Sequence, residues 1–302
     1  MKKLALAAVL VAATSMASAQ VEVSGKIGMY MDKTEKGGVQ TSGVVQEATN
    51  NITFRAKEDL GRGLSARVVV DTKLTTADPT SANTQLGDRE STVGLVNSLG
   101  SVDMGRSYTS SFNVIRLTDP FGNLYASIAP DIHPDHGKRF SNGVFVKATP
   151  IAGAQISYDR VQATAAGVEG LSYGVNYKFH NMELKAARFE QGVEKSNVYG
   201  AVAKLATTRL SVIHSEDTSA TGVQTKGTSV GVAQPISGTK VTMLASYGEK
   251  TGNAATDAKA YNVGMNYDFS KRTAAQVMYR KVDANVASLD TRQVGVGLIH
   301  RF

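Results

Sequence analysis

Residues 171–179 read Leu-Ser-Tyr-Gly-Val-Asn-Tyr-Lys-Phe, with an apolar or aromatic residue at every odd position and a small or polar one at every even position. Residues 261–269, Tyr-Asn-Val-Gly-Met-Asn-Tyr-Asp-Phe, repeat this alternation without a fault. A period of two separates the two faces of a β-strand, whereas a helix needs apolar residues three and four apart, and that spacing is nowhere sustained. The sequence therefore predicts an all-β protein.

About sixteen such runs lie between residue 20 and the C-terminus. Many are about ten residues long, the length of a tilted strand that crosses a bilayer. Some connections are short, such as 97–100 and 180–181, while 33–49, 75–87 and 109–137 are longer. Short turns at one end and longer loops at the other are typical of an outer-membrane barrel. We therefore expect a transmembrane antiparallel β-barrel of about 16 strands.

The composition of the two strand faces separates a barrel from a soluble β-sandwich. Mean hydropathy is −0.16 and by itself would suggest a soluble protein. The apolar face carries few charges and is bordered by aromatic residues such as Tyr173, Phe179 and Phe269, which suit a membrane interface. The opposite face is rich in Gly, Asn, Ser, Lys and Arg, which line water rather than fill a core. A closed barrel also leaves no unpaired sheet edge in lipid.

Both ends of the sequence fit an exported barrel. A basic start at 1–3, an apolar stretch at 4–13 and Ala17-Ser18-Ala19 form a secretory signal, so we expect cleavage after residue 19 and a single domain over 20–302. The chain has no cysteine, which excludes disulfides and a lipoprotein anchor. The last run, 290–302, ends at a bare Phe302, as a strand would if it closed the barrel against residues 21–26.

Charge and motifs argue against other function classes. The net charge is +7 (+5 without the two lysines of the signal), and it is spread along the chain, so we expect no nucleic-acid partner. The chain has five histidines and none has the surroundings of a catalytic triad, so we expect no enzyme activity. His133 and His136, with Asp131, have metal-ligating side chains, but a plain polar loop is the better interpretation, and we expect neither metal nor cofactor.

Several segments resemble the Gram-negative trimeric general porins, in particular their betaproteobacterial branch: 54–64 (FRAKEDLGRGL), 89–95 (RESTVGL) with 100–106 (GSVDMGR), and 295–302 (GVGLIHRF). The resemblance implies an outer-membrane homotrimer of sixteen-stranded barrels surrounded by lipid and lipopolysaccharide. It also implies that Phe302 is an assembly signal read by the outer-membrane assembly machinery, and that the third extracellular loop folds into the lumen.

The loop at 109–137 is the longest stretch without alternation and holds three of the six prolines. Long irregular segments in compact proteins are usually functional or disordered. Residues 119–123, Asp-Pro-Phe-Gly-Asn, are similar to the acidic Pro–Phe–Gly turn of the porin constriction loop. The resemblance makes Asp119 the acid of the constriction; a floppy surface loop is the alternative.

Strand parity predicts which charged side chains face the lumen. The basic ones are Arg55, Lys57, Arg67 and Arg139, and the resemblance adds Arg89 as a pore-lining arginine. In general porins three wall arginines face acids of the inward loop, and the resemblance retains two of them as Arg89 and Arg139. The third corresponds to Asn51, which Arg55 could partly replace. We therefore expect passive diffusion of small hydrophilic solutes and ions with a mild preference for anions. Ordinary solvation of the lumen is the alternative for any single arginine.

Arg106 has the opposite parity, because it shares a face with Val102 and Met104. A lone arginine in lipid is costly. The resemblance places this arginine at the subunit interface, with Asp78 or Asp88 of a neighbour as its partner. Two other functions stay open: a substrate-specific channel, although the chain has no tryptophan for a sugar track, and a non-conducting adhesin or structural barrel.

Overall fold

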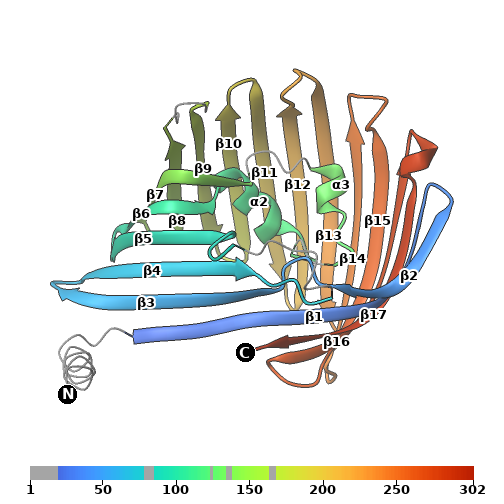
Figure 1. Ribbon diagram of the computed structural model, residues 1–302, viewed down its shortest axis with the longest axis horizontal. Helices are drawn as coiled ribbons and strands as arrows, with labels where there is room; N and C mark the ends of the chain where they lie inside the picture. Colours follow the sequence, from blue (N-terminus) through green and yellow to red (C-terminus); the bar gives the residue numbers. More distant parts are fainter. Residues whose placement is uncertain (1–19, 78–84, 123–124, 134–137, 163–167) are drawn as a thin grey trace, which may run out of the picture.

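The computed structural model describes residues 20–77, 85–122, 125–133, 138–162 and 168–302; the expected signal at 1–19 lies outside these ranges. Within them, seventeen strand segments form one antiparallel sheet that curls around a lumen (Figure 1). The strands are β1 (Gln20–Lys36), β2 (Val39–Gln46), β3 (Asn51–Gly61), β4 (Leu64–Lys73), β5 (Glu90–Asn97), β6 (Gly100–Tyr108), β7 (Arg139–Ile151), β8 (Ala154–Val161), β9 (Gly170–Phe179), β10 (Met182–Gln191), β11 (Glu194–Leu205), β12 (Thr208–Thr218), β13 (Gln224–Pro235), β14 (Val241–Thr251), β15 (Ala258–Asp268), β16 (Thr273–Ala284) and β17 (Thr291–Arg301). The helices are α2 (Ser110–Thr118), α3 (Ala129–Ile132) and the short 3-10 helix η1 (Ala287–Leu289).

The barrel has sixteen strands, because β2 and β3 follow one another along the same side of β1. Residues 29–36 of β1 pair with β2, and residues 20–26 pair with β3. On its other side β1 pairs with β17 over residues 26–36, which closes the sheet. The fold class predicted from the alternation is confirmed. The expected loop at 33–49 is wrong: β1 continues to Lys36 and turns at Gly37 and Gly38 into β2.

The step between β2 and β3 is filled by side-chain hydrogen bonds. The Asn50 side chain is fully buried: its Oδ1 accepts from the Gly28 N–H at 2.7 Å, and its Nδ2 donates to the Gly28 carbonyl at 3.0 Å. Because Asn50 thus pairs with Gly28 as a strand partner would, Ala48 to Asn50 can leave the ladder while the backbone groups of β1 stay satisfied. The Glu47 carboxylate is carried into the lumen by this step.

The last strand closes the barrel with its apolar side outward. Val294, Val296 and Leu298 are 41–58% exposed, and the glycines between them point inward. Phe302 continues the pairing beyond β17: its N–H donates to the Gly25 carbonyl at 3.1 Å, and its carbonyl accepts from the Gly25 N–H at 2.9 Å. The final residue of the chain is therefore part of the seam.

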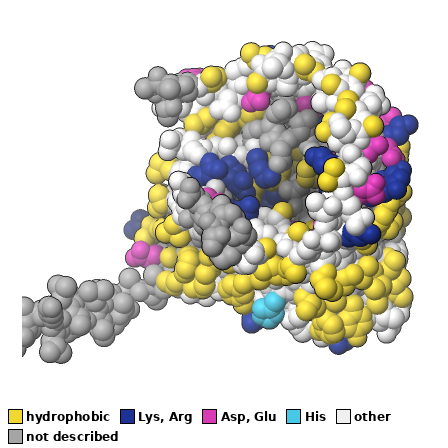
Figure 2. Space-filling model, turned by 45° about the vertical axis from the view of Figure 1, so that its right-hand side comes forward, with side chains coloured by type: hydrophobic (Ala, Val, Ile, Leu, Met, Phe, Trp, Pro, Cys, Tyr) yellow, Lys and Arg dark blue, Asp and Glu magenta, His cyan; other side chains and the backbone are white. Residues whose placement is uncertain are grey.

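The outer surface of the barrel is apolar and the interior is charged. Residues such as Val93, Val102 and Met104 are 46–56% exposed on the outside. Figure 2 shows hydrophobic side chains over the outer surface and Lys and Arg side chains gathered inside the hollow. Exposed apolar patches of this extent on a closed barrel are stable only in contact with lipid.

No helix in the described part of the chain is long and apolar enough to cross a membrane.

The described part of the loop at 109–137, residues 109–122 and 125–133, lies inside the barrel and carries two helices, although the sequence pattern predicted no regular structure there. Thr109 caps α2, accepting from the Phe112 N–H at 3.3 Å, and Pro130 lies in the first turn of α3. The helix α2 packs on β9 to β12, and α3 on β13 to β15 (Figure 1). The buried apolar clusters are formed mainly where this loop meets the wall.

Glycines on the inner wall allow this close approach. A Cβ on Gly200 would lie 2.7 Å from the Thr118 hydroxyl, one on Gly231 2.5 Å from Pro120, and one on Gly248 2.8 Å from Ile132. Such distances are shorter than real Cβ contacts, so only glycine admits the loop at these positions. The wall of β11 to β17 is thus shaped to seat the loop.

Candidate functional site

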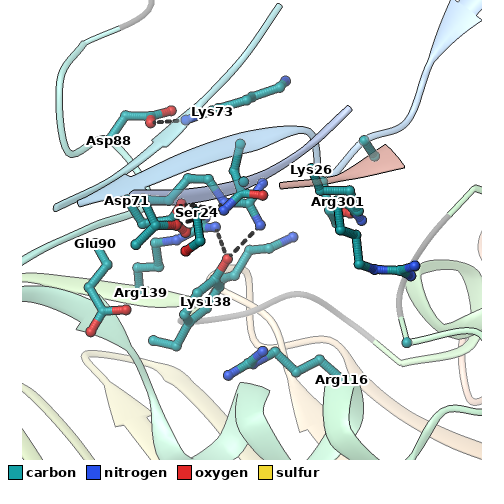
Figure 3. Close-up of a pocket in the computed structure, with 18 of the residues that line it drawn as sticks. Ser24, Lys26, Asp71, Lys73, Asp88, Glu90, Arg116, Lys138, Arg139 and Arg301 are labelled. Atoms are coloured by element: carbon teal, nitrogen blue, oxygen red, sulfur yellow. Dashed lines mark hydrogen bonds and ion pairs between the residues drawn. The ribbon is translucent and has the colours of Figure 1, made fainter. Parts of the chain in front are cut away.

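A cavity of about 670 Å³ lies in the lumen between β1, the strands β3 to β7, α2 and the C-terminus. Its lining includes eight basic side chains, namely Lys26, Arg55, Lys73, Arg89, Arg116, Lys138, Arg139 and Arg301. Three acidic side chains, Asp71, Asp88 and Glu90, also line it. Figure 3 shows basic groups entering from the strands and, as Arg116, from the helix below. The cavity therefore carries a large excess of positive charge.

Tyr108, the last residue of β6, joins two of the predicted lumen arginines. Its hydroxyl oxygen accepts from Arg89 at 2.9 Å and from Arg139 at 2.6 Å. The Arg139 guanidinium also lies 4.2 Å from the centre of the Tyr108 ring. Arg89 is paired with Asp71, its Nε lying 3.3 Å from the carboxylate, and both side chains are largely buried. The structure thus brings Arg89 and Arg139 together on one phenol group.

Arg55 lines the same cavity at its margin, where it donates to the Ser24 hydroxyl at 2.9 Å. The other two predicted basic residues do not line it. Arg67 forms an ion pair with Asp103 and donates to the Ser101 hydroxyl at 3.0 Å. Lys57 is exposed, and its backbone pairs with that of Arg67 on β4. Parity placed these residues on a face, but the cavity occupies only part of that face.

Asp119 does not line the cavity. Its side chain is buried, accepts from the Ser127 hydroxyl at 2.7 Å and accepts from the Phe121 N–H at 3.2 Å. The other described acid of the loop, Asp131, forms a bidentate pair with Arg280 of β16 at 2.5 Å. Within the described part of the loop, both carboxylates therefore hold the loop in place, and neither lines the cavity. Asp131 thus lies opposite a wall arginine, but that arginine is Arg280 rather than Arg89 or Arg139.

A second group of buried residues fixes the loop to the closing seam. The Tyr125 N–H donates to both carboxylate oxygens of Glu47 at 3.0 Å, and its hydroxyl donates to Asp32. The Tyr125 ring stacks on Tyr30 with centroids 3.9 Å apart. Burial raises the pKa of the Tyr125 phenol, and the hydrogen bond to Asp32 raises it further, so the phenol stays protonated and keeps donating.

His133, considered above as a metal ligand, is bonded to the wall. Its Nδ1 lies 3.0 Å from the Ser215 hydroxyl and its Nε2 lies 2.8 Å from the Ser229 hydroxyl, and the ring is fully buried. Burial lowers the pKa of His133 to about 3, with a smaller contribution from His214. Residue 136, the other histidine of that motif, lies outside the described residues.

Arg106 is bonded within its own chain at the outer end of β6. Its Nε donates to the Asp88 carbonyl at 2.7 Å, and another guanidinium nitrogen donates to the Ser141 hydroxyl. The Asp88 carboxylate accepts from the Lys73 N–H at 2.7 Å instead. Asp78, the other expected partner acid, lies outside the described residues.

Sequence reasoning missed Tyr108, Arg116 and Lys138 as lining residues. Arg116 lies 4.7 Å from the centre of the Tyr108 ring, and Lys138 lies 4.7 Å from that of Phe112. A signal was present, because Tyr108, Phe112 and Arg116 are each four residues apart, the spacing that aligns side chains on one helix face. This spacing is a weak signal, because it begins at the end of a strand and continues over only one short helix.

A sixteen-stranded barrel with an inward loop and a charged lumen defines a porin. The family model described as Gram-negative porin matches residues 5–287. The chain therefore belongs to the Gram-negative porin family and forms an outer-membrane channel for passive diffusion. The family and the fold point to a channel rather than to an enzyme. A comparison with curated protein sequences gave no match.

Solved porin structures share the fold. An anion-selective porin from Comamonas acidovorans is 19% identical with a TM-score of 0.83, covering 94% of this chain and 100% of that one. OmpF of Salmonella typhi in complex with daunomycin is 18% identical with a TM-score of 0.78, covering 94% and 98%. OmpT of Vibrio cholerae, described as a trimer form, is 12% identical with a TM-score of 0.71, covering 94% and 99%. These identities are low, so the likeness concerns the fold.

Proposed function

We propose that this porin prefers small anions over cations. The observation that carries the proposal is the lumen cavity, in which eight basic side chains meet three acidic ones. A charged cleft with walls of low dielectric constant focuses the field and raises the local concentration of counter-ions. Charged groups at a constriction set selectivity in this way. The description of the Comamonas acidovorans neighbour as anion-selective agrees with this proposal.

Pairing reduces but does not cancel the positive charge. Asp71 is engaged by Arg89 and by hydrogen bonds from Asn51 and Thr53 at 2.7 Å and 2.9 Å. Asn51, which stands where the resemblance expects a third arginine, thus orients the acid that holds Arg89. Arg139, Lys138 and Arg301 line the same space. An anion that crosses the cavity therefore meets several cationic groups.

The test is the reversal potential of single channels in a KCl gradient. We expect the unmodified channel to be anion-preferring, and the Arg89→Ala and Arg139→Ala variants to lose most of that preference. Because the Debye length is about 8 Å at physiological ionic strength and about 3 Å at 1 M, the preference should weaken in concentrated salt. A cation-preferring unmodified channel, or a preference that survives both substitutions, would contradict the proposal.

We further propose that the porin assembles as a homotrimer in which Arg106 lies at the subunit interface. Parity puts Arg106 on the face of the exposed Met104 and Val102, and its guanidinium donates to the Asp88 carbonyl and to Ser141. An arginine that faces lipid is costly, whereas at a subunit interface it can meet polar groups of a partner subunit. Arg106→Ala should convert an SDS-resistant trimer into monomers on unheated gels; a persisting trimer would count against this role.

A further inference from the structure

The helix α2 is held against the barrel wall by polar and charged side chains at both of its ends. At its N-terminus the Ser110 N–H and the Ser110 hydroxyl both donate at 2.6 Å to one carboxylate oxygen of Asp159 on β8, and the Ser111 N–H donates to the Ser172 hydroxyl at 3.1 Å. An acid at this position satisfies free N–H groups and complements the positive end of the helix dipole.

The C-terminus of α2 meets two cations. Arg209 of β12 donates to the Leu117 and Thr118 carbonyls at 3.0 Å and 2.9 Å. Lys185 of β10 donates to the Leu117 carbonyl at 3.4 Å and pairs with Glu183 at 3.4 Å. These contacts satisfy terminal carbonyls and complement the negative end of the dipole. The direction of α2 is therefore set by the wall.

The rotation of α2 about its own axis is set by apolar packing. Val114 and Ile115 are buried against a wall cluster of Ala187, Val198 and Ile213. Arg116 follows directly in the sequence, and its side chain lines the lumen cavity. With the ends and the buried face fixed, the helix cannot turn without carrying Arg116 away from the cavity.

The Arg116 guanidinium ends at Tyr108. Its Nε donates to Asn113 at 2.7 Å, and its central carbon lies 4.7 Å from the centre of the Tyr108 ring. The same phenol carries Arg89 and Arg139 on its oxygen, and Phe112 stacks on its ring at 5.5 Å. Three guanidinium groups would repel one another, but attraction to the ring and to the phenol oxygen offsets part of that repulsion.

We propose that Arg116 is a specificity-determining residue of this channel, and that Tyr108 is the residue that positions it together with Arg89 and Arg139. The inference rests on the anion preference proposed above. In this proposal the inward loop contributes a positive charge, Arg116, to the cavity. The described acids of the loop, Asp119 and Asp131, instead bind Ser127 and Arg280. A passing anion then meets positive charge from both the wall and the loop. It does not cross a transverse field between a positive wall and a negative loop.

The first experiment compares reversal potentials of the unmodified channel with those of Arg116→Gln, Arg116→Lys and Arg188→Gln. Removal of one partly screened charge should lower the anion-to-cation permeability ratio about threefold in Arg116→Gln. Arg116→Lys should keep most of the ratio, because it keeps the charge. Arg188 is the matched control, since it pairs with Glu190 at 2.5 Å and does not line the cavity.

An unchanged ratio in Arg116→Gln, alongside a lowered ratio in Arg89→Ala, would overturn the inference and leave the proposed anion preference standing. A cation-preferring unmodified channel whose ratio falls further in Arg116→Gln would overturn the anion preference and leave the role of Arg116 standing. If Arg116→Lys lowered the anion-to-cation permeability ratio as much as Arg116→Gln does, that result would also contradict a role based on charge.

Tyr108 is tested through its coupling to Arg116. Tyr108→Phe keeps the ring and removes the acceptor oxygen, whereas Tyr108→Leu removes both, so we expect a partial and a fuller loss of the ratio. If Tyr108 acts by holding Arg116, Tyr108→Leu should change the ratio less in an Arg116→Gln background than in the unmodified channel. An equal change in both backgrounds would overturn the positioning role. Heat-modifiable gel mobility verifies that each variant forms a folded barrel.

Discussion

The hydroxyl of Tyr125 occupies the space in which a side chain on Gly295 would lie. A Cβ built on Gly295 overlaps that hydroxyl, and the ring of Tyr125 is held there by Asp32, Glu47 and Tyr30. A residue of the inward loop and a residue of the closing strand, 170 positions apart in the sequence, thus share one contact. The glycine in this strand determines how closely the loop can approach the seam.

Gly295→Ala should displace the loop toward the middle of the lumen and reduce the conductance. The added methyl group cannot be accommodated without moving Tyr125 from Asp32, and overpacking of this kind typically costs about 1–3 kcal/mol. Single-channel conductance and liposome swelling with sugars of graded size measure the effect. Gly43→Ala is the matched control, because nothing lies within 4 Å of a Cβ at Gly43. Equal conductance in the two variants would contradict the prediction.

Glu47→Gln should loosen the loop at the same anchor. The substitution keeps the size of the side chain but removes the charge that accepts from the Tyr125 N–H and the Tyr30 hydroxyl. Hydrogen bonds to charged groups contribute about 1.5–3 kcal/mol each. We expect more frequent brief closures in current records and a lower temperature of the heat-induced mobility shift. Glu58→Gln, at an exposed position of β3, should leave the closure frequency and the shift temperature unchanged. If Glu47→Gln closed no more often than this control, the role of the anchor would be refuted.

Acid should release the loop at His133. The His133 ring has a pKa of about 3 while it is bound to the wall, whereas a histidine in a model peptide in water has a pKa of about 6.5. Between these values a released ring binds a proton and the seated ring does not, so the seated state loses stability as the pH falls from about 6.5 toward 3 and loses no more below that.

We therefore expect current fluctuations to increase between pH 6.5 and 4.5 in the unmodified channel, and to increase less in His133→Gln, which has no ring to protonate. The comparison is made by single-channel recording at matched ionic strength. His180→Asn removes a histidine from an exposed turn with a positive φ of 49°, which asparagine tolerates, and should keep the full pH response. An identical pH response in His133→Gln would exclude His133 as its source.

Deletion of Phe302 should impair assembly more than conduction. The residue forms two backbone hydrogen bonds with Gly25 at the seam and is itself 42% exposed. We expect less folded protein in outer-membrane fractions, while those channels that insert conduct normally. Phe179→Ala is the control, since that ring is 52% exposed elsewhere on the outer surface. Normal yield of the deletion variant, or equal loss in the control, would argue against a special role of the terminus.

The strands that cross the membrane could be predicted because one face meets lipid and the other meets water. The strand β2 could not, because the residues of Val39–Gln46 are exposed or only partly buried on both faces, and such a strand has no one-sided pattern. The helix α2 was missed for a different reason. Its nine residues cover less than three turns, too few for helical spacing to stand out from the surrounding alternation.

The charged residues of the lumen show the same difference between what the sequence pattern predicts and what only the folded structure decides. Parity assigned Arg67 to the inner face and the family resemblance assigned Arg89 there, but only Arg89 lines the cavity, while Arg67 pairs with Asp103 two strands away. Asp119 has the acidic character that the constriction loop was expected to supply, yet its carboxylate caps the turn that follows α2 and binds Ser127. The sequence supplied the residue type in both cases, whereas the partner that each side chain meets depends on the tertiary structure.

The sequence by itself determined the closed barrel, its outward apolar face and its closing strand, because alternation with a period of two is a local property of each strand. The tertiary structure alone decided that Arg89, Arg116 and Arg139 meet at Tyr108, and that the described loop acids bind Ser127 and Arg280 instead of lining the cavity. These contacts join residues from different strands and a folded-in loop. They depend on the register between strands and on the seat of the loop against wall glycines, which no single stretch of sequence encodes.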